Sequence, residues 1–202
     1  MAKVLILFAH PALEKSRVHK QLIRHVRQLN GVRFHDLYEA YPDLDINVKH
    51  EQELLLQHDL VIFQHPFYWY SAPAIIKQWQ DLVLEHGWAY GSGGNALAGK
   101  QLMNVISCGA PRSVYSPEGR NRFTIPQFLA SFDQTAVLCK MEYLPPFVVH
   151  GTHRLLPADI ELHAVQYEQM LIALVNNRIS AEEYMEVEYL NDLVPIPQTI
   201  QS

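Results

Sequence analysis

Residues 3–9 read KVLILFA and residues 60–63 read LVIF. Continuous apolar runs of this kind are typical of parallel strands that are buried on both faces of a sheet. Residues 102–106, LMNVI, have the same character. The three runs therefore predict the central strands of a parallel sheet.

Amphipathic patterns lie between and after these runs. Apolar residues at helical spacing predict helices that begin after Ser16, Asn47 and Pro73, and two more that cover 125–140 and follow Pro157. Two further strands are predicted at 32–38, near a sheet edge, and within 141–149, where Pro145-Pro146 interrupts the run. Five strands that alternate with five helices predict a doubly wound α/β fold with right-handed crossovers.

Composition narrows the class of protein. The chain has 202 residues, 49% apolar and 18% charged, with a net charge of −5, which excludes disorder and argues against nucleic acid as a partner. Two cysteines, Cys108 and Cys139, do not make a disulfide framework, so a reducing cytosol is expected. No apolar run reaches the ~18 residues of a membrane span, and the N-terminus shows no signal-peptide pattern.

The segments that follow the predicted strands matter most, because ligands bind beyond the carboxyl ends of such strands. The first, 10–19, has neither G-x-G-x-x-G nor a P-loop, so a Rossmann dinucleotide site and a P-loop ATPase are not expected. It does place Ser16 at a helix start, followed by the N–H groups of 17–19, which favours a phosphate site. The alternative is that Ser16 only caps the helix.

The other two segments favour a flat ligand. Four large residues, Phe67 to Tyr70, follow the strand at 60–63 and can flank a conjugated ring, or else pack as core or dimer surface. Ser107 to Ala110 are small enough for a ligand to approach the backbone, and Tyr115 is a candidate donor; the alternative is an ordinary loop with a buried Cys108. Phosphate at one end and a flat ring at the other describe FMN.

At these residues the chain resembles the flavodoxin-like NAD(P)H:quinone oxidoreductase family, most closely the ancillary subunits of the Kef glutathione-gated potassium efflux systems. The similarity runs from about Lys3 to Asn176. It is carried by AHP at 9–11, DLY at 36–38, YPD at 41–43, QHP at 64–66, WYS at 69–71, GWAYG at 87–91, GG at 93–94 and LPPF at 144–147. The resemblance implies a five-stranded parallel sheet of order 2-1-3-4-5, with helices on both faces, and a homodimer.

The resemblance also implies roles for particular residues. The flavin-phosphate loop corresponds to His10, Ser16, Arg17, Val18 and His19. The stretch that lines the isoalloxazine corresponds to Pro66, Phe67, Tyr68, Trp69 and Tyr70, and the loop at its polar edge to Ser107, Cys108, Gly109 and Ala110. Tyr115 matches a tyrosine that supports hydride transfer, and Trp88 and Tyr90 match a segment that closes the partner subunit's substrate pocket.

The implied activity is that of an FMN-dependent NAD(P)H:quinone oxidoreductase with NAD(P)H as co-substrate. The implied setting is cytoplasmic, as an activating subunit peripheral to the membrane on a potassium efflux antiporter. Catalytic members read Thr-Thr-Gly-Gly where this chain reads Ser107-Cys108-Gly109-Ala110, so the alternative is a regulatory docking subunit with little turnover. A flavodoxin-like electron carrier is less favoured, because such carriers tend to be strongly acidic.

Two remaining features complete the expectations. His150 and His153 have a metal-like spacing, but zinc needs three or four ligands and no third accompanies them, so no metal is expected. The flavodoxin-like FMN-binding domain is expected at 1–177 and an acidic, partly helical tail at 178–202. The acids of that tail are Glu182, Glu183, Glu186, Glu188 and Asp192.

Overall fold

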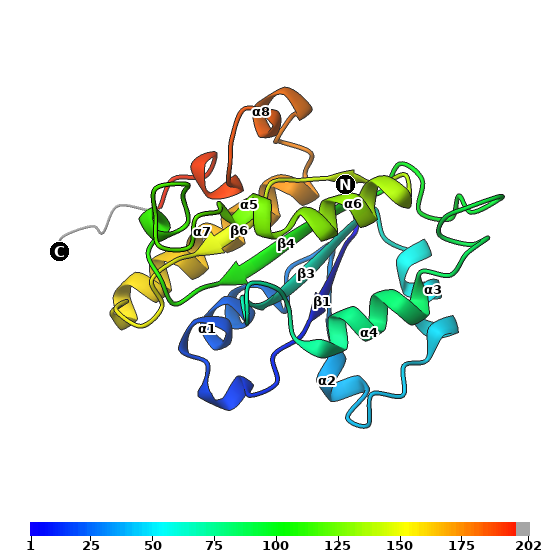
Figure 1. Cartoon of the computed structure of the whole chain (residues 1–202), viewed down its shortest axis with the longest axis horizontal. Coiled ribbons are helices and arrows are strands. Elements are labelled where there is room, and N and C mark those ends of the chain that lie inside the picture. Colours follow the sequence, from blue (N-terminus) through cyan, green and yellow to red (C-terminus); the bar gives the residue numbers. More distant parts are fainter. Residues whose placement is uncertain (197–202) are drawn as a thin grey trace.

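A computed structural model describes residues 1–196; the last part of the expected tail, 197–202, lies outside the described residues. Its centre is a twisted parallel sheet in the order β2-β1-β3-β4-β5, with β6 also paired to β4 (Figure 1). The strands are β1 Val4–Phe8, β2 Val32–Asp36, β3 Leu60–Pro66, β4 Gln101–Ser107, β5 Glu142–Tyr143 and β6 Phe147–Val149. The predicted flavodoxin-like order is confirmed.

The last strand position is shared by two short strands. β5 pairs with the start of β4 and β6 pairs with its end. Pro145 and Pro146 lie between them and lack the N–H that a continuous ladder would need. The interruption predicted from the two prolines is therefore observed as a break in the fifth strand.

Helices cover both faces of the sheet (Figure 1). On one face lie α1 Arg17–Val26 and α7 Pro157–Val175. On the other lie α2 Leu37–Ala40, α3 Val48–Leu56, α4 Ala74–Val83, α5 Ile125–Phe128 and α6 Ala130–Leu138. The remaining elements are α8 Ala181–Met185 and the 3-10 turns η1 Leu13–Lys15, η2 Arg112–Val114 and η3 Leu190–Asp192.

The central strand β1 explains why the core has two layers. All five of its residues are fully buried. Val4, Ile6 and Phe8 point to the face of α1 and α7, whereas Leu5 and Leu7 point to the face of α3 and α4. Side chains alternate across a strand, so a strand covered on both faces must be apolar throughout.

Helix starts follow the sequence closely. Ser16 accepts a hydrogen bond from the His19 N–H and Asn47 accepts one from the His50 N–H, as N-caps do. One predicted strand is shorter than expected, because the Asp36 carboxylate caps α2 by accepting from the N–H groups of Tyr38 and Glu39. The predicted helix at 125–140 is two helices that meet at Leu129.

The chain after α7 folds back onto the sheet. Ser180 and Glu183 form a capping box that starts α8, and Tyr184, Tyr189 and Leu190 are buried. The domain boundary expected at 177 stays a prediction, and within residues 178–196 it is these three side chains that join the core. Among the helices within residues 1–196, none combines the length and apolar character needed to cross a membrane.

Candidate functional site

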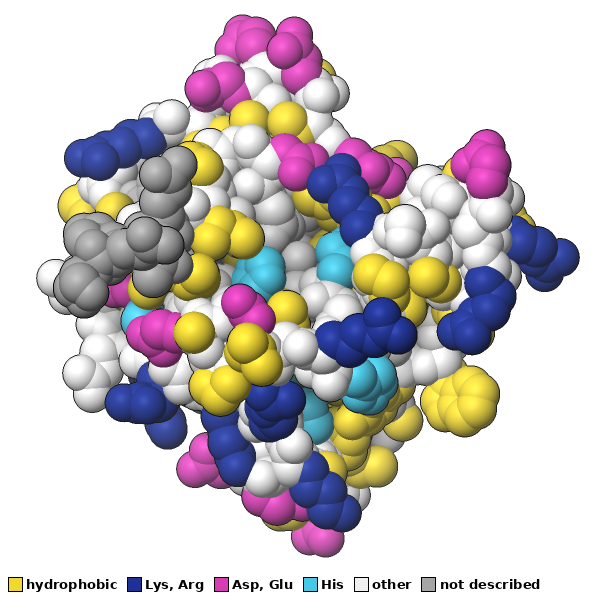
Figure 2. Space-filling model, turned by 90° about the vertical axis from the view of Figure 1, so that its left-hand side faces the viewer, with side chains coloured by type: hydrophobic (Ala, Val, Ile, Leu, Met, Phe, Trp, Pro, Cys, Tyr) yellow, Lys and Arg dark blue, Asp and Glu magenta, His cyan; other side chains and the backbone are white. Residues whose placement is uncertain are grey.

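Four loops meet beyond the carboxyl ends of the strands and enclose two adjoining cavities. The first has a volume of about 450 Å³ and lies at the start of α1, and the second, of about 750 Å³, lies between the loops after β3 and β4. Phe67, Gly109 and His153 line both cavities. Figure 2 views the molecule from the side toward which β4 points in Figure 1, and shows Lys, Arg and His side chains, with some acidic ones, across the lower half of this face.

The start of α1 supplies the anion-binding end of the first cavity. Ser16, Arg17 and Val18 line it, together with Lys15 from η1. Ser16 Oγ satisfies the N–H of His19 at 3.1 Å, whereas the first-turn N–H groups of Arg17 and Val18 have no acceptor within the helix. With the positive end of the helix dipole and two cationic side chains, this end fits a phosphate.

His10 closes the same cavity from the end of β1. Its ring is 7% exposed, and its Nδ1 accepts a hydrogen bond from the Ala12 N–H at 3.2 Å. Burial lowers the pKa of this imidazole. The ring is therefore neutral with its proton on Nε2, which makes Nε2 a hydrogen-bond donor.

A buried chain of hydrogen bonds runs beneath the cavity to Ser107. The Tyr167 hydroxyl donates to Gln64 Oε1 at 2.9 Å, which turns the Gln64 amide nitrogen toward His19 Nδ1 at 3.5 Å. His19 Nε2 then carries the proton and donates to Ser107 Oγ at 2.9 Å. Burial holds the pKa of His19 well below its usual value, so the ring stays neutral. The hydroxyl proton of Ser107 is left free to donate into the cavity that this residue lines.

The aromatic loop after β3 makes a strained turn. The Ser71 N–H donates to the Tyr68 carbonyl, and the two residues between them, Trp69 and Tyr70, both have positive φ, at 51° and 64°. This is the backbone of a turn that ordinarily takes asparagine and glycine. Aromatic residues there cost free energy, and such strain gathers at functional sites. The turn leaves Trp69 93% exposed at the rim of the second cavity.

The loop after β4 presents backbone donors to the second cavity. The Cys108 N–H is used by the Val149 carbonyl, but the N–H groups of Gly109 and Ala110 meet no acceptor within residues 1–196. Gly109 allows the His153 ring to lie close to the backbone, since a Cβ there would lie 2.4 Å from His153 Nε2 and the ring would have to move. These adjacent free amides suit the polar edge of a flat heterocycle.

Tyr115 lines the same cavity and packs edge-on against Phe67. Burial, with the neighbouring Cys108 thiol, raises the pKa of Tyr115, so it stays a phenol at neutral pH. Burial likewise raises the pKa of Cys108 to about 12, and the thiol contacts His150 Nδ1 at 3.2 Å. Tyr115 can thus donate a hydrogen bond to a ligand, whereas Cys108 is an unreactive buried thiol.

The structure gathers most of the expected site residues but not all. Lining the two cavities are His10, Ser16, Arg17, Val18, Pro66, Phe67, Tyr68, Trp69, Tyr70, Ser107, Gly109, Ala110 and Tyr115. The side chains of His19 and Cys108 lie beneath and line neither cavity. Tyr90 lines a separate cavity of about 420 Å³ between α4 and α6, and Trp88 lies in the same loop as Tyr90. Their expected place at a partner subunit's pocket stays a prediction.

Sequence reasoning missed several residues at the site. Thr152, His153 and Arg154 reach it from the loop after β6 and were not assigned to the site. Arg120 and Asn121, at the end of the loop after β4, also line the second cavity. The rule that ligands bind beyond the strand ends applies to the fifth strand as well. Applied there, it would have identified 150–154. The two histidines of the metal-like spacing have different neighbours: His150 Nδ1 contacts Cys108, and the His153 ring lies against Gly109.

Comparison with known proteins gives matches over most of the chain. The model of a family with a flavodoxin-like fold matches residues 2–171. The glutathione-regulated potassium-efflux system ancillary protein KefG of Pectobacterium carotovorum is 44% identical over 169 residues, 84% of this chain and 92% of that protein. The crystal structure of general stress protein 14 from Treponema denticola in complex with FMN has a TM-score of 0.80 at 38% identity, covering 87% of this chain and 98% of that one. An NADPH-quinone reductase from P. pentosaceus has a TM-score of 0.75 at 36% identity, covering 83% and 96%.

Proposed function

The chain belongs to the flavodoxin-like family that includes these proteins, and from that premise we propose that it is an FMN-dependent NAD(P)H:quinone oxidoreductase. The observation that carries the proposal is the pair of adjoining cavities, with helix N–H groups at one end and aromatic side chains and free amides at the other. Their volumes lie within the range of cofactor sites.

The residues present fit FMN at both ends. The N–H groups of Arg17 and Val18 would bind its phosphate, and Ser107 and His10 would donate to its polar chain. Phe67 and the turn that follows it would flank the ring. Bound FMN would supply hydride transfer between a nicotinamide and a quinone.

The chain's own residues would bind and orient the reactants. The free N–H groups of Gly109 and Ala110 are held in place before a ligand arrives, and such fixed donors stabilise negative charge that develops on a bound group. Tyr115, a phenol at neutral pH, would hold a proton at the edge of the substrate position. Trp69 would shield that position from water.

Flavin titration tests the binding proposal. We expect the purified chain to bind FMN and quench its fluorescence, and Ser107→Ala to weaken binding by about tenfold through loss of one hydrogen bond in a buried site. Ser113→Ala, in the same loop but on neither cavity, is the matched control. A chain that binds no FMN would contradict the proposed function.

Turnover is tested separately with NAD(P)H and a benzoquinone. Tyr115→Phe removes the phenolic proton and keeps the ring, so kcat is expected to fall about a hundredfold while FMN affinity stays unchanged. Unchanged kcat in this variant would remove Tyr115 from the chemistry. Bound FMN without any turnover would favour the regulatory alternative.

We further propose that the protein is an activating subunit of a glutathione-gated potassium efflux antiporter and works as a homodimer at the inner face of the membrane. The similarity to proteins named as ancillary subunits of such systems supports this proposal. Co-expression with the antiporter tests it: the two proteins should co-purify and potassium efflux should rise. Absence of both effects would leave the oxidoreductase proposal standing alone.

A further inference from the structure

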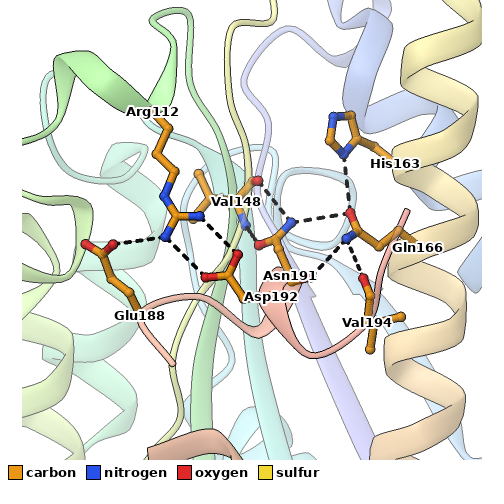
Figure 3. Close-up of polar contacts among 8 residues, drawn as sticks. All are labelled: Arg112, Val148, His163, Gln166, Glu188, Asn191, Asp192 and Val194. Carbon is orange, nitrogen blue, oxygen red and sulfur yellow. Dashed lines mark hydrogen bonds and ion pairs between the residues drawn. The ribbon is translucent and has the colours of Figure 1, made fainter. Parts of the chain in front are cut away.

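The segment after α8 lies along the edge of the sheet, beyond the residues that the family model matches. We call residues 186–194 the strap. Tyr189 and Leu190 are buried, at 1% and 0% exposure, although they belong to a segment that the sequence suggested was an acidic tail. Figure 3 shows the strap passing between α7 on one side and Arg112 on the other. Its contacts therefore join two parts of the molecule that are far apart in sequence.

The strap covers the free edge of β6. The Asn191 side chain accepts from the Val148 N–H at 2.8 Å and donates to the Val148 carbonyl at 3.2 Å (Figure 3). The Leu190 N–H also donates to the Pro146 carbonyl. These contacts occupy backbone groups that a further strand would otherwise pair with. The strap is thereby fixed in register with the strand whose end leads to His150.

α7 anchors the other side of the strap. Gln166, 2% exposed, donates from Nε2 to the carbonyls of Asn191 and Val194 at 3.1 and 2.6 Å (Figure 3). A buried amide that satisfies two carbonyls of one segment holds that segment rigidly. The strap is therefore a fixed support at this point and not a loosely attached tail.

Arg112 connects the strap to the candidate site. Its guanidinium makes a two-pronged ion pair with Asp192, at 3.0 and 3.1 Å, and a further one with Glu188 at 3.1 Å (Figure 3). The same group lies over the Tyr189 ring at 4.2 Å. A single exposed ion pair contributes little, but two-pronged geometry within a network on an aromatic face restrains the arginine.

The restraint passes directly to Tyr115. Arg112 opens η2, and its carbonyl accepts the N–H of Tyr115 at 2.9 Å. Besides this 3-10 turn, residues 109–121 contain no regular secondary structure, yet they carry Tyr115 and the free amides of Gly109 and Ala110. Donors that act on a ligand must be held in place beforehand. The loop has turn hydrogen bonds of its own, and the contacts of Arg112 with the strap add a restraint from outside the loop.

We propose that the strap positions the loop 109–121, with Arg112 and Asp192 as positioning residues that set the orientation of Tyr115. This inference rests on the proposed oxidoreductase function for its catalytic consequence, but the restraint itself is a property of the chain without ligand. It assigns a role in the site to a segment outside the family model.

Hydrogen exchange on the ligand-free chain tests the restraint. In Arg112→Gln, the amides of 112–121 should exchange about tenfold faster, a factor equal to about 1.4 kcal/mol, while those of β1 and β3 stay unchanged. Asp192→Asn should act in the same direction but more weakly, because Arg112 keeps its contacts with Glu188 and the Tyr189 ring. The double variant should be no faster than Arg112→Gln, which already removes the pair with Asp192. Arg112→Lys keeps the charge but not the two-pronged geometry, so its exchange rates at 112–121 should lie between those of wild type and Arg112→Gln.

A matched control and a kinetic readout separate positioning from plain stability. Glu182→Gln, in α8, removes an acid that lies just before the strap. This acid makes none of the described contacts with Arg112, so exchange at 112–121 should stay unchanged. In steady-state turnover, Asp192→Asn should lower kcat about fivefold or more, with a smaller change in KM for the quinone, because the phenol of Tyr115 is then held less firmly. Arg112→Lys should keep more of the wild-type kcat than Arg112→Gln.

Two results would overturn the proposal. Equal exchange at 112–121 in wild type and Arg112→Gln would show that the strap does not restrain the loop. Uniformly faster exchange across the whole chain would show that it only covers the sheet edge. If the chain binds no flavin, the proposed function fails but the exchange experiment still decides the restraint.

Discussion

Two buried polar networks lie on opposite faces of the sheet, and they differ in charge and in where they end. On the face of α3 and α4, Glu51 is fully buried and accepts from His35 Nε2, the Tyr41 hydroxyl and Trp79 Nε1 at 2.8, 2.6 and 2.8 Å. Every partner points inward, so this network is closed around one carboxylate. It holds β2, α3 and α4 together and reaches neither cavity of the candidate site.

The chain from Tyr167 to Ser107, on the face of α1 and α7, carries no charge. Burial keeps His19 neutral. Glu51 stays ionised instead: burial raises its pKa, but the hydrogen bonds from His35, Tyr41 and Trp79 outweigh burial and bring the pKa below its usual value. A closed network can stabilise a buried charge because all its donors converge on the one carboxylate. An open chain that must deliver one oriented donor to a ligand works best with neutral groups.

Removing the central carboxylate should have the largest effect. Glu51→Ala leaves buried donors from Tyr41 and Trp79 unpaired, so we expect the free energy of unfolding to fall by about 3–5 kcal/mol. Urea unfolding followed by circular dichroism measures this. Glu53→Ala, an exposed acid on the same helix, is the control and should change stability by less than about 0.5 kcal/mol. A loss below 1 kcal/mol in Glu51→Ala would show that the network is not a unit.

The two networks should also lose their contributions to the free energy of unfolding at different pH values. His19 has a lowered pKa, so between about 6.5 and its folded pKa the unfolded chain binds a proton that the folded chain does not. Stability therefore falls as pH drops below 6.5, by up to about 1.4 kcal/mol per pH unit. His65 adds to this, since burial lowers its pKa to about 4. Glu51, with its lowered pKa, loses its contribution only at lower pH, as the pH falls through its folded value.

Urea unfolding at several pH values between 7.5 and 4.5 measures this dependence. His19→Gln keeps a hydrogen-bonding side chain but cannot titrate, so its stability should depend less steeply on pH. His50→Gln replaces an exposed histidine and should leave the slope as in the wild type. Equal slopes in His19→Gln and the wild type would mean that His19 is protonated in the folded chain.

Removing the Tyr167 hydroxyl, at the end of the neutral hydrogen-bond network farthest from Ser107, should lower the free energy of unfolding less than Glu51→Ala does. It should, however, also weaken FMN binding. Tyr167→Phe leaves Gln64 Oε1 without its donor, which costs about 1–2 kcal/mol. The Gln64 amide is then free to turn over, His19 can shift its proton, and Ser107 loses its fixed role as a donor. FMN affinity should fall about tenfold, as in Ser107→Ala.

Tyr143→Phe is the matched control for that experiment. Its hydroxyl donates to Asn104 Oδ1 at 2.6 Å in a part-buried pair that does not lead to Ser107. It should lose similar stability and keep full FMN affinity. If both variants lose affinity equally, the effect of Tyr167 is general loosening and not orientation of Ser107.

The sequence predicted the fold well because a parallel strand that is buried on both faces has a continuous apolar sequence. The runs at 3–9, 60–63 and 102–106 are apolar because both faces of the sheet are covered, and Ser16 and Asn47 mark helix starts by the chemistry of their side chains. The resemblance added the strand order, which no spacing within this chain specifies.

The candidate site was only partly predictable, for a physical reason. Residues 66–70 and 107–110 follow obvious strands, so their convergence could be inferred. The strap could not, because its contacts depend on long-range geometry: Asp192 meets Arg112 across 80 positions of sequence. An acidic composition describes which residues the segment contains but not the single arginine that they surround.

A charged cluster at the surface gives the smallest expected effect and the opposite pH dependence. His25 on α1 lies between Glu161 and Glu168 of α7, at 2.9 and 2.8 Å. Burial lowers its pKa, but the hydrogen bonds to Glu168 and Glu161 outweigh burial, so the pKa is raised. Its contribution to stability is therefore full below about pH 6.5 and is lost as the pH rises through the raised value. We expect wild type to exceed His25→Gln by up to about 1 kcal/mol at pH 6 and by nothing near pH 9, in urea unfolding at both values. His19 lowers the stability of the chain as the pH falls, whereas loss of the His25 charge lowers it as the pH rises. A stability difference between wild type and His25→Gln that grew with pH would therefore show that His25 is not held as a charged imidazolium between α1 and α7.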